Sequence, residues 1–220
     1  MAINELGMEL KQYNLLDEGD YDAVIFGVIN LGLQTVEFQG EVKQPATFIR
    51  LILEIPSITD SEGNSATIQK KVKLTSSVDK GNYAKLLVAL GEKVTTANIS
   101  NYLTPAALQG LLGKTASVKI EHFNTADGKR NMVQDISRLD PRLPQPKGTK
   151  KHFFFNPFNP DLDVFKDDVT IYGKKEIMGA LNSSNFPKEL HAAWVEVQEQ
   201  KESNTTTSKG VTKTNTSAIE

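Results

Sequence analysis

The chain of 220 residues contains no cysteine. Without cysteine there are no disulfide bonds and no thiolate metal sites, and the composition is compatible with a reducing cytoplasm. Long hydrophobic runs are also missing, because no window approaches the roughly twenty apolar residues that a membrane helix needs. The N-terminal stretch MAINELGMELKQ lacks the basic and apolar regions of a secretory signal. We therefore expect a cytoplasmic protein without membrane contact.

Residue patterns typical of catalysis are scarce as well. The three histidines are scattered without metal-ligand spacing, and the sequence has no glycine-rich phosphate loop and no GxSxG motif. Two acidic pairs, Asp161 with Asp163 and Asp167 with Asp168, could hold a divalent cation as in a nuclease. They stand in a turn-rich segment with no nearby general acid, so helix capping is the preferred interpretation. The sequence thus predicts neither an enzyme nor a cofactor or metal site.

The formal net charge of −2 hides an uneven distribution. Residues 1–65 carry 3 Lys and Arg against 11 Asp and Glu, whereas residues 66–151 carry 15 against 6, and residues 152–220 carry 7 against 10. A basic middle between acidic ends is typical of a core that binds a polyanion, although lysine-rich loops give the same balance. Because the basic segment coincides with predicted strands and turns, we favour the polyanion interpretation.

Three consecutive strands are predicted between Tyr21 and Ser76. Val, Ile, Phe and Thr are frequent in this stretch, and turn residues separate the hydrophobic runs. The first strand, at about 21–38, is unusually long, and Gly27 and Gly32 predict bends or bulges within it. The segment 39–45 is predicted as the connection to the second strand.

The second and third strands are predicted to have two different faces. Aliphatic residues at alternate positions form one face: Ile49, Leu51, Leu53 and Ile55, then Ile68, Val72 and Leu74. The other face carries Phe48 and Arg50, then Lys71 and Lys73. Rings beside cations suit a small barrel that stacks bases and binds a phosphate backbone. An ordinary half-buried sheet with a solvated outer side gives the same pattern.

After Ser76 the hydrophobic period changes to that of helices. Helical spacing predicts one helix around residues 83–90 and a second that begins at Thr104-Pro105. Two further strands, 115–123 and 130–139, are joined by NTADGK, whose Asp-Gly pair is a strong hairpin signal. This order predicts a mainly β fold, a five-stranded OB-fold barrel with a helical insertion between strands 3 and 4. A generic five-stranded barrel or half-sandwich fits the same order.

The sequence divides into five segments. We expect a short N-terminal helix or arm at 1–17, the OB-fold domain at 18–140, a proline-rich linker at 141–151, a C-terminal aromatic and helical extension at 152–202, and a disordered tail at 203–220. The extension begins with HFFFNPF, an aromatic run that would be a liability if exposed. We expect these rings to pack on the barrel of the same chain or on a partner copy.

Several short motifs resemble those of a known family. They are Gly19-x-Tyr21, Leu31-Gly32-x-Gln34, RLILEIP at 50–56 and KVKLTS at 71–76, together with the helix YAKLLVALG and the Asp-Gly hairpin. Over roughly residues 18–195 the chain resembles tailed-bacteriophage early proteins that are treated as single-stranded DNA-binding proteins with an OB-fold. The resemblance implies a role in DNA replication or recombination in the cytoplasm of the infected bacterial host. Phage replication proteins and a second copy of the chain are possible partners.

Our main hypothesis is sequence-independent binding and protection of single-stranded DNA, by aromatic stacking and by Lys and Arg contacts with phosphates. Arg50 is expected to matter most among the cations, because a guanidinium both stacks and pairs with phosphate. The expected nucleic-acid-binding residues are Phe38, Lys43, Phe48, Arg50, Lys71, Lys73, Lys119, Phe123, Lys129 and Arg130. Each ring is also compatible with a core position and each cation with a solvated surface. The alternative hypothesis is an OB-like protein-interaction module, a replisome adaptor or virion accessory protein without catalytic activity.

Overall fold

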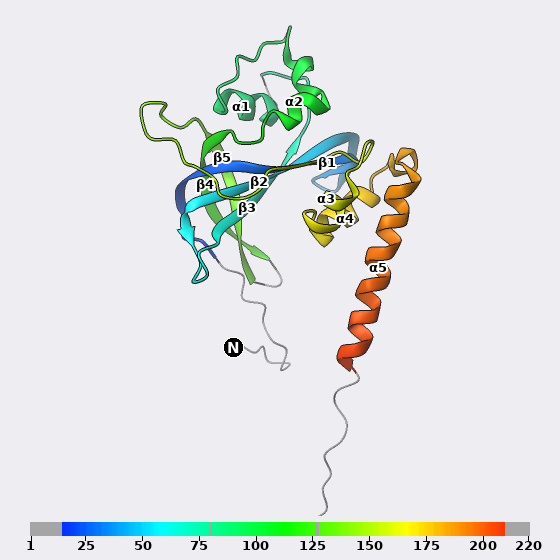
Figure 1. Ribbon diagram of the computed structural model, residues 1–220. Coiled ribbons are helices and arrows are strands. Elements are labelled where there is room, and N and C mark those ends of the chain that lie inside the picture. Colours follow the sequence, from blue (N-terminus) through cyan, green and yellow to red (C-terminus); the bar gives the residue numbers. More distant parts are fainter. Residues whose placement is uncertain (1–14, 80, 126–127, 210–220) are drawn as a thin grey trace, which may run out of the picture.

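The computed structural model describes residues 15–79, 81–125 and 128–209, and the fold is mainly β (Figure 1). Six strands form one sheet in the order β3-β2-β1-β4-β5, with β6 paired to β1. All pairings along that path are antiparallel, whereas β6 runs parallel to β1. The strands are β1 (Gly19–Phe38), β2 (Glu41–Thr59), β3 (Ser65–Lys73), β4 (Thr115–Thr125), β5 (Gly128–Ser137) and β6 (Phe153–Phe155).

Helices occur in two places along the chain. The insertion between β3 and β4 lies above the sheet in Figure 1, and the extension after β6 lies beside it. The insertion contains α1 (Asn82–Ala89), the 3-10 helix η1 (Ile99–Leu103) and α2 (Pro105–Gln109). The extension contains α3 (Leu162–Asp167), α4 (Ile171–Met178), the 3-10 helix η2 (Ser183–Asn185) and α5 (Lys188–Lys209).

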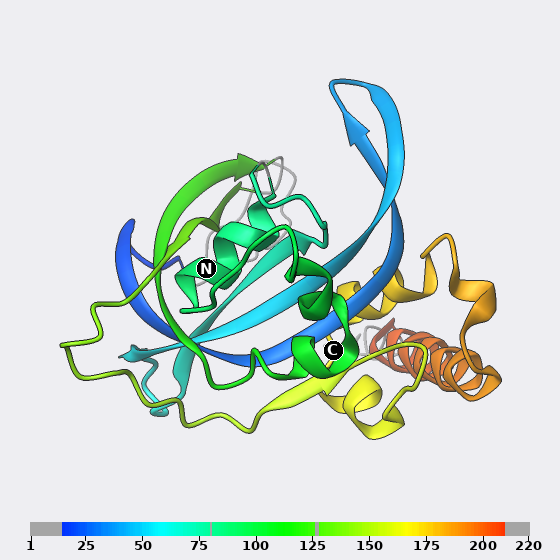
Figure 2. The same cartoon turned by 90° about the horizontal axis from the view of Figure 1, so that it is seen from above.

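The long strand β1 serves two parts of the sheet. Its first residues pair with β4, and the rest pairs with β2. Register shifts in the β1–β2 pairing fall at Gly27 and around Gly32, so the predicted bulges are confirmed. Beyond them, β1 and β2 continue as a two-stranded ribbon that leaves the body of the molecule (Figure 2). Residues 41–45 belong to this ribbon, so the predicted connection at 39–45 is wrong except for its turn at Gln39 and Gly40.

The inner face of the sheet carries the main core. The predicted aliphatic row of β2, from Ile49 to Ile55, is completely buried at alternate positions, which confirms the predicted face. Tyr83 and Leu87 of α1 pack against this core from above. The helical insertion therefore closes one end of the curved sheet by hydrophobic burial.

The sheet is not a closed barrel. Within the described residues no strand ladder joins β3 to β5, and these two strands remain the edges of the sheet. The expected closed five-stranded barrel is therefore not confirmed, and what the structure shows is an unclosed antiparallel sheet with a sixth, parallel strand. The two edges are nevertheless near each other, because the side chain of Lys70 on β3 reaches the backbone of β5.

A second hydrophobic core covers the outer face of β1 and β2. Phe155, Phe165 and Leu190 of the extension are fully buried there, against Leu31 of β1 and Ile52 of β2. The strand β6 adds backbone pairing to this contact. Of the two expected packings of the aromatic run, the structure shows packing on the same chain for Phe153 and Phe155, whereas Phe158 is 45% exposed.

A buried carboxylate fixes the segment that leads into β6. Glu54 of β2 is completely buried, and both of its oxygens accept hydrogen bonds from the backbone N–H of Thr149 at 3.0 Å. The Thr149 hydroxyl donates to Glu54 Oε1 at 2.7 Å, and the N–H of Lys150 donates to Oε2 at 3.2 Å. The proline-rich segment is thus tied to the outer face of the sheet, without helix or strand of its own before β6.

Two predicted capping residues begin helices in the structure. Thr104 and Asp161 accept hydrogen bonds at the starts of α2 and α3, as expected for capping residues. The helix α5 extends to Lys209, into the segment 203–220 that the sequence predicts as a disordered tail. Most of the predicted N-terminal segment and residues 210–220 lie outside the described residues. In the described part of the chain, no helix is long and apolar enough to cross a membrane.

Candidate nucleic-acid interface

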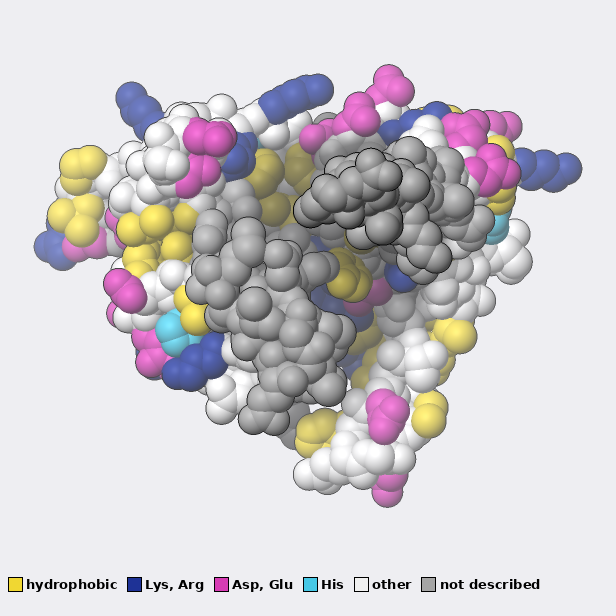
Figure 3. Space-filling model, turned by 90° about the horizontal axis from the view of Figure 1, so that it is seen from below, with side chains coloured by type: hydrophobic (Ala, Val, Ile, Leu, Met, Phe, Trp, Pro, Cys, Tyr) yellow, Lys and Arg dark blue, Asp and Glu magenta, His cyan; other side chains and the backbone are white. Residues whose placement is uncertain are grey.

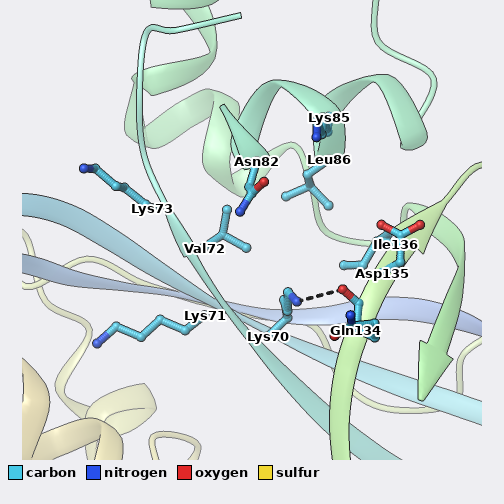
Figure 4. A pocket seen from close by; sticks show the side chains of 10 residues that line it. All are labelled: Lys70, Lys71, Val72, Lys73, Asn82, Lys85, Leu86, Gln134, Asp135 and Ile136. Carbon is cyan, nitrogen blue, oxygen red and sulfur yellow. Dashed lines mark hydrogen bonds between the residues drawn. The ribbon is translucent and has the colours of Figure 1, made fainter. Parts of the chain in front are cut away.

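Four lysines gather where the sheet fails to close. We call this region the β3–β5 opening: the space between the edges of β3 and β5, covered at one end by α1 (Figure 4). It contains a pocket of about 130 Å³. The lining residues are Lys70, Lys71, Val72, Lys73, Asn82, Lys85, Leu86, Gln134, Asp135 and Ile136. Asp135 is the one acidic residue in this set, so the lining is strongly basic.

Lys70 points across the β3–β5 opening. It lies on the same side of β3 as the buried residues Ile68 and Val72, so its stem is half-buried. Its ammonium donates hydrogen bonds to the carbonyl oxygens of Val133 and, at 3.4 Å, of Gln134. Burial lowers the pKa of Lys70, and the nearby carboxylate of Asp135 opposes that shift.

Gln134 is part of an irregularity in β5. Lys119 of β4 pairs with Asp135 while the next residue, Ile120, pairs with Val133, so Gln134 is left outside the ladder. This bulge directs backbone carbonyls of β5 toward β3, where Lys70 meets them. The bulge therefore explains why a side chain, rather than a ladder, connects the two edge strands.

Lys71 and Lys73 lie on the opposite side of β3 from Lys70 (Figure 4). In the ladder Lys73 pairs with Phe48 and Lys71 pairs with Arg50, so the predicted group of two cations beside a ring and a guanidinium is brought together. The Lys71 ammonium lies 4.7 Å from the centroid of the Phe48 ring. Lys73 is exposed and makes no ion pair with the residues that the structure describes.

Arg50 differs from the expectation because its guanidinium is already occupied. Its side chain is only 12% exposed and forms an ion pair with Glu176 of α4. The other oxygen of Glu176 lies 3.2 Å from the Lys71 ammonium. Phe48 is half-buried at the margin of the second core. The part of the predicted face that lies on β2 is therefore covered by the extension, whereas the part on β3 borders solvent.

The remaining predicted residues lie away from the β3–β5 opening. Phe38, 61% exposed, is near the tip of the β1–β2 ribbon, and Lys43 on the same ribbon forms an ion pair with Glu41. The ribbon stands out from the body and carries exposed hydrophobic and acidic side chains (Figure 3). Neither residue joins the lysine group.

A second group lies on the β4–β5 hairpin. Phe123 of β4 is partly exposed and pairs in the ladder with Arg130 of β5, next to Lys129. Lys119, farther along β4, has its ammonium 2.8 Å from a Glu121 carboxylate oxygen, and this carboxylate raises the pKa of Lys119. The hairpin thus places the Phe123 ring opposite Arg130, with Lys129 on the other face opposite Asn124, and Lys119 pairs with Glu121.

Sequence reasoning missed two lysines of the opening. The sequence prediction includes no role for Lys70, which shares a side with Ile68 and Val72 and finds its acceptor on the irregular β5. Lys85 lies on the exposed side of α1, and its place at the opening depends on how the insertion folds over the edge of β3. Within the described residues, no group of three His, Cys, Asp or Glu side chains could hold a metal ion. Four of the ten side chains that line the opening are cationic and one is acidic, which suits anion binding.

Comparison with known proteins assigns no family to this chain. No protein-family model matches the chain. No curated protein matches it either. The resemblance to phage single-stranded DNA-binding proteins therefore stays a prediction. The structural evidence that bears on function is the geometry around the β3–β5 opening.

Proposed function

We propose that the protein binds single-stranded DNA with little sequence preference and protects it during phage replication or recombination. The observation that carries this proposal is a set of lysines on both sides of the β3 edge. Lys70 and Lys85 line the β3–β5 opening, whereas Lys71 and Lys73 lie on the other side of β3, beside the Phe48 ring. Cations along a groove bind the phosphate backbone of a single strand, and rings beside them stack bases. No base-specific hydrogen-bond readout is needed for such binding.

The fold is consistent with this proposal at the level of strand order. We infer that the sheet is an OB-fold barrel left open between β3 and β5, since OB-folds are five-stranded and only partly closed. The helical insertion between β3 and β4 covers one end of the sheet, as the sequence order predicts. In OB-folds the face of strands 2 and 3 and the two hairpin loops bind oligonucleotides. Here the β3 side of that face is the part that borders solvent.

Strand β5 connects the β3–β5 opening with the β4–β5 hairpin. Arg130 and Gln134 are four residues apart on β5, which corresponds to about 13 Å of strand. A single strand could therefore contact Lys73 and Lys85 at the opening and reach Phe123 and Arg130 at the hairpin. Each stacked base would contribute about 1–3 kcal/mol, and each neutralised phosphate would release bound counterions.

The test is a titration of a fluorescein-labelled oligo-dT at several salt concentrations. The wild-type chain should bind at low salt and lose affinity steeply as salt rises. The variant Lys73→Gln/Lys85→Gln should bind more weakly, and its slope of log K against log salt should fall by about 1.4, two phosphate contacts at about 0.7 each. An excess of duplex DNA should compete poorly.

A charge-matched control separates local contacts from net charge. Lys147→Gln/Lys188→Gln removes the same charge from two exposed positions outside the lining of the opening, and it should keep the wild-type slope. If the wild-type chain does not bind at low salt, the proposed function is refuted. If both double variants lose the same affinity, binding does not depend on the β3–β5 opening.

One observation favours the alternative of a protein-interaction module. The β1–β2 ribbon projects from the body and exposes Phe38 by 61% and Val42 by 74% near its tip. Large exposed hydrophobic side chains on a projecting element are common at protein contacts. Capture of a protein partner by the wild-type chain but not by Phe38→Ser/Val42→Ser, without any shift of single-stranded DNA, would select this alternative.

A further inference from the structure

A carboxylate of the extension occupies the cation pair on the outer face of the sheet. Arg50 of β2 and Lys71 of β3 are directly opposite each other in the ladder, so their charged groups point to the same side. Glu176 of α4 lies between them and gives one oxygen to each: Oε2 to the Arg50 guanidinium and Oε1 to the Lys71 ammonium at 3.2 Å. Two cations that share one bidentate acceptor form an anion site.

This anion site borders solvent. The side chains of Lys71 and Glu176 are 38% and 31% exposed, whereas that of Arg50 is 12% exposed. Lys73 and the Phe48 ring are immediate neighbours, because Lys73 pairs with Phe48 and Lys71 lies over the ring. An anion that reaches Arg50 and Lys71 would therefore already be in contact with the lysine group of the β3–β5 opening.

The backbone of α4 is held independently of the Glu176 carboxylate. Ile177 is fully buried in the second core, and the Lys174 ammonium donates to the carbonyl oxygen of Lys166 at 2.7 Å. The Gln34 side chain of β1 donates to the backbone carbonyl oxygen of Glu176 at 3.1 Å. The Glu176 side chain can thus rotate toward solvent while the helix stays in place.

We propose that Arg50 and Lys71 form a phosphate-binding site, that Glu176 occupies it in the free protein, and that a backbone phosphate of a single strand exchanges with the Glu176 carboxylate. This inference rests on the proposed function. It adds that the Glu176 carboxylate competes with DNA phosphates for Arg50 and Lys71. Carboxylate and phosphate present comparable oxygen pairs to a guanidinium, so one can replace the other. The exchange moves one anion out and one anion in, so the cation pair is never left unpaired in its partly buried position.

The test compares two variants of the extension that remove the same charge. Glu176→Gln removes the carboxylate that pairs with Arg50 and Lys71. Glu196→Gln is the control: the Glu196 carboxylate lies 2.7 Å from the Lys166 ammonium, and this exposed ion pair involves neither Arg50 nor Lys71. With oligo-dT as the probe, Glu176→Gln should bind about fivefold tighter than wild type, the lower end of typical coupling between two ligands of one protein. Glu196→Gln should match wild type. Equal affinities of the two variants, or weaker binding by Glu176→Gln, overturn the inference.

A second measurement excludes a general loosening of the extension. Hydrogen exchange of the wild-type chain should show that the amides of α4 keep their protection when oligo-dT is added, because only the Glu176 side chain moves. Loss of protection throughout α4 would refute the exchange of side chain for phosphate. Adding Lys71→Gln to Glu176→Gln should abolish the gain in affinity, and a retained gain also counts against the inference.

The outcomes keep the two proposals apart. If neither wild type nor Glu176→Gln binds oligo-dT at low salt, both proposals fall. If wild type binds with the expected salt dependence but Glu176→Gln gains nothing, the proposed function stands and the competitor role of Glu176 is refuted.

Discussion

The buried carboxylate of Glu54 provides a sharp test of how the extension is attached. Its two oxygens accept hydrogen bonds from the N–H groups of Thr149 and Lys150 and from the Thr149 hydroxyl. In Glu54→Gln one oxygen becomes an amide nitrogen, which cannot accept, so at least one of the three donors of the 149–150 segment (two N–H groups and the Thr149 hydroxyl) loses its acceptor. The shape of the side chain is preserved, so the variant isolates this change.

The expected loss follows from these contacts. A hydrogen bond to a charged group contributes about 1.5–3 kcal/mol, and water can replace part of it because Thr149 itself is exposed. We therefore expect Glu54→Gln to lower the free energy of unfolding by about 2 kcal/mol. For a chain of this length, this corresponds to a decrease of roughly 4–8 °C in Tm.

The same contacts set the pH dependence. Burial raises the pKa of Glu54, but the hydrogen bonds from Thr149, Ser65 and Lys150 together outweigh burial and hold this pKa below its ordinary value of 4.5. A group with a lowered pKa in the folded state stabilises the fold above its ordinary pKa and loses that contribution as the pH falls through the lowered value. The difference in stability between wild type and Glu54→Gln should therefore be full at neutral pH and shrink below about pH 4.5.

Thermal unfolding followed by circular dichroism at several pH values measures both effects. The control is Glu41→Gln on the ribbon, where the carboxylate is mostly exposed and its pair with Lys43 should contribute little. If Glu54→Gln is as stable as wild type at neutral pH, or if the difference stays constant down to pH 3, the reasoning about the buried carboxylate is wrong.

Two further predictions concern the contact between the extension and the sheet. Phe155→Ala should lower the free energy of unfolding by about 3–5 kcal/mol because the ring is completely buried. Phe158→Ala removes a partly exposed ring and should lower it clearly less; equal losses in chemical denaturation would contradict the burial of Phe155 in the second core. Gly27→Ala should destabilise by about 1–3 kcal/mol because a Cβ there would overlap the Phe153 ring. Adding Phe153→Leu should recover part of that loss, and strictly additive effects would show that Gly27 and Phe153 do not interact.

Local patterns in the sequence carry most of the fold. Alternation of Ile49, Leu51 and Leu53 predicts the inner face, and glycines inside a long strand predict its bulges. Thr104-Pro105 predicts a helix start because capping depends on neighbours in sequence. Each of these features depends only on residues that are neighbours in the sequence, so the sequence reveals them directly.

The coverage of the outer face depends on contacts over long sequence distances. Alternation assigns Phe48 and Arg50 to the outer side, but Glu176, which pairs with Arg50, is 126 residues away. One local signal did exist: Leu51, Ile52 and Leu53 form a continuous apolar run, which is typical of a strand buried on both faces. The candidate site was accordingly predicted in part, with Lys71 and Lys73 at the β3–β5 opening and Lys70 and Lys85 missed.

The link between the two edge strands has a mechanical consequence. Because a lysine side chain, rather than backbone amides, spans from β3 to β5, the separation of these strands depends on flexible methylene groups. Among the described residues no backbone ladder joins these strands, so a change in their separation would alter the Lys70 hydrogen bonds and side-chain packing rather than a ladder of the sheet. For the single-stranded DNA that we propose as the ligand, an opening whose width depends on a side chain would accommodate bases of different sizes.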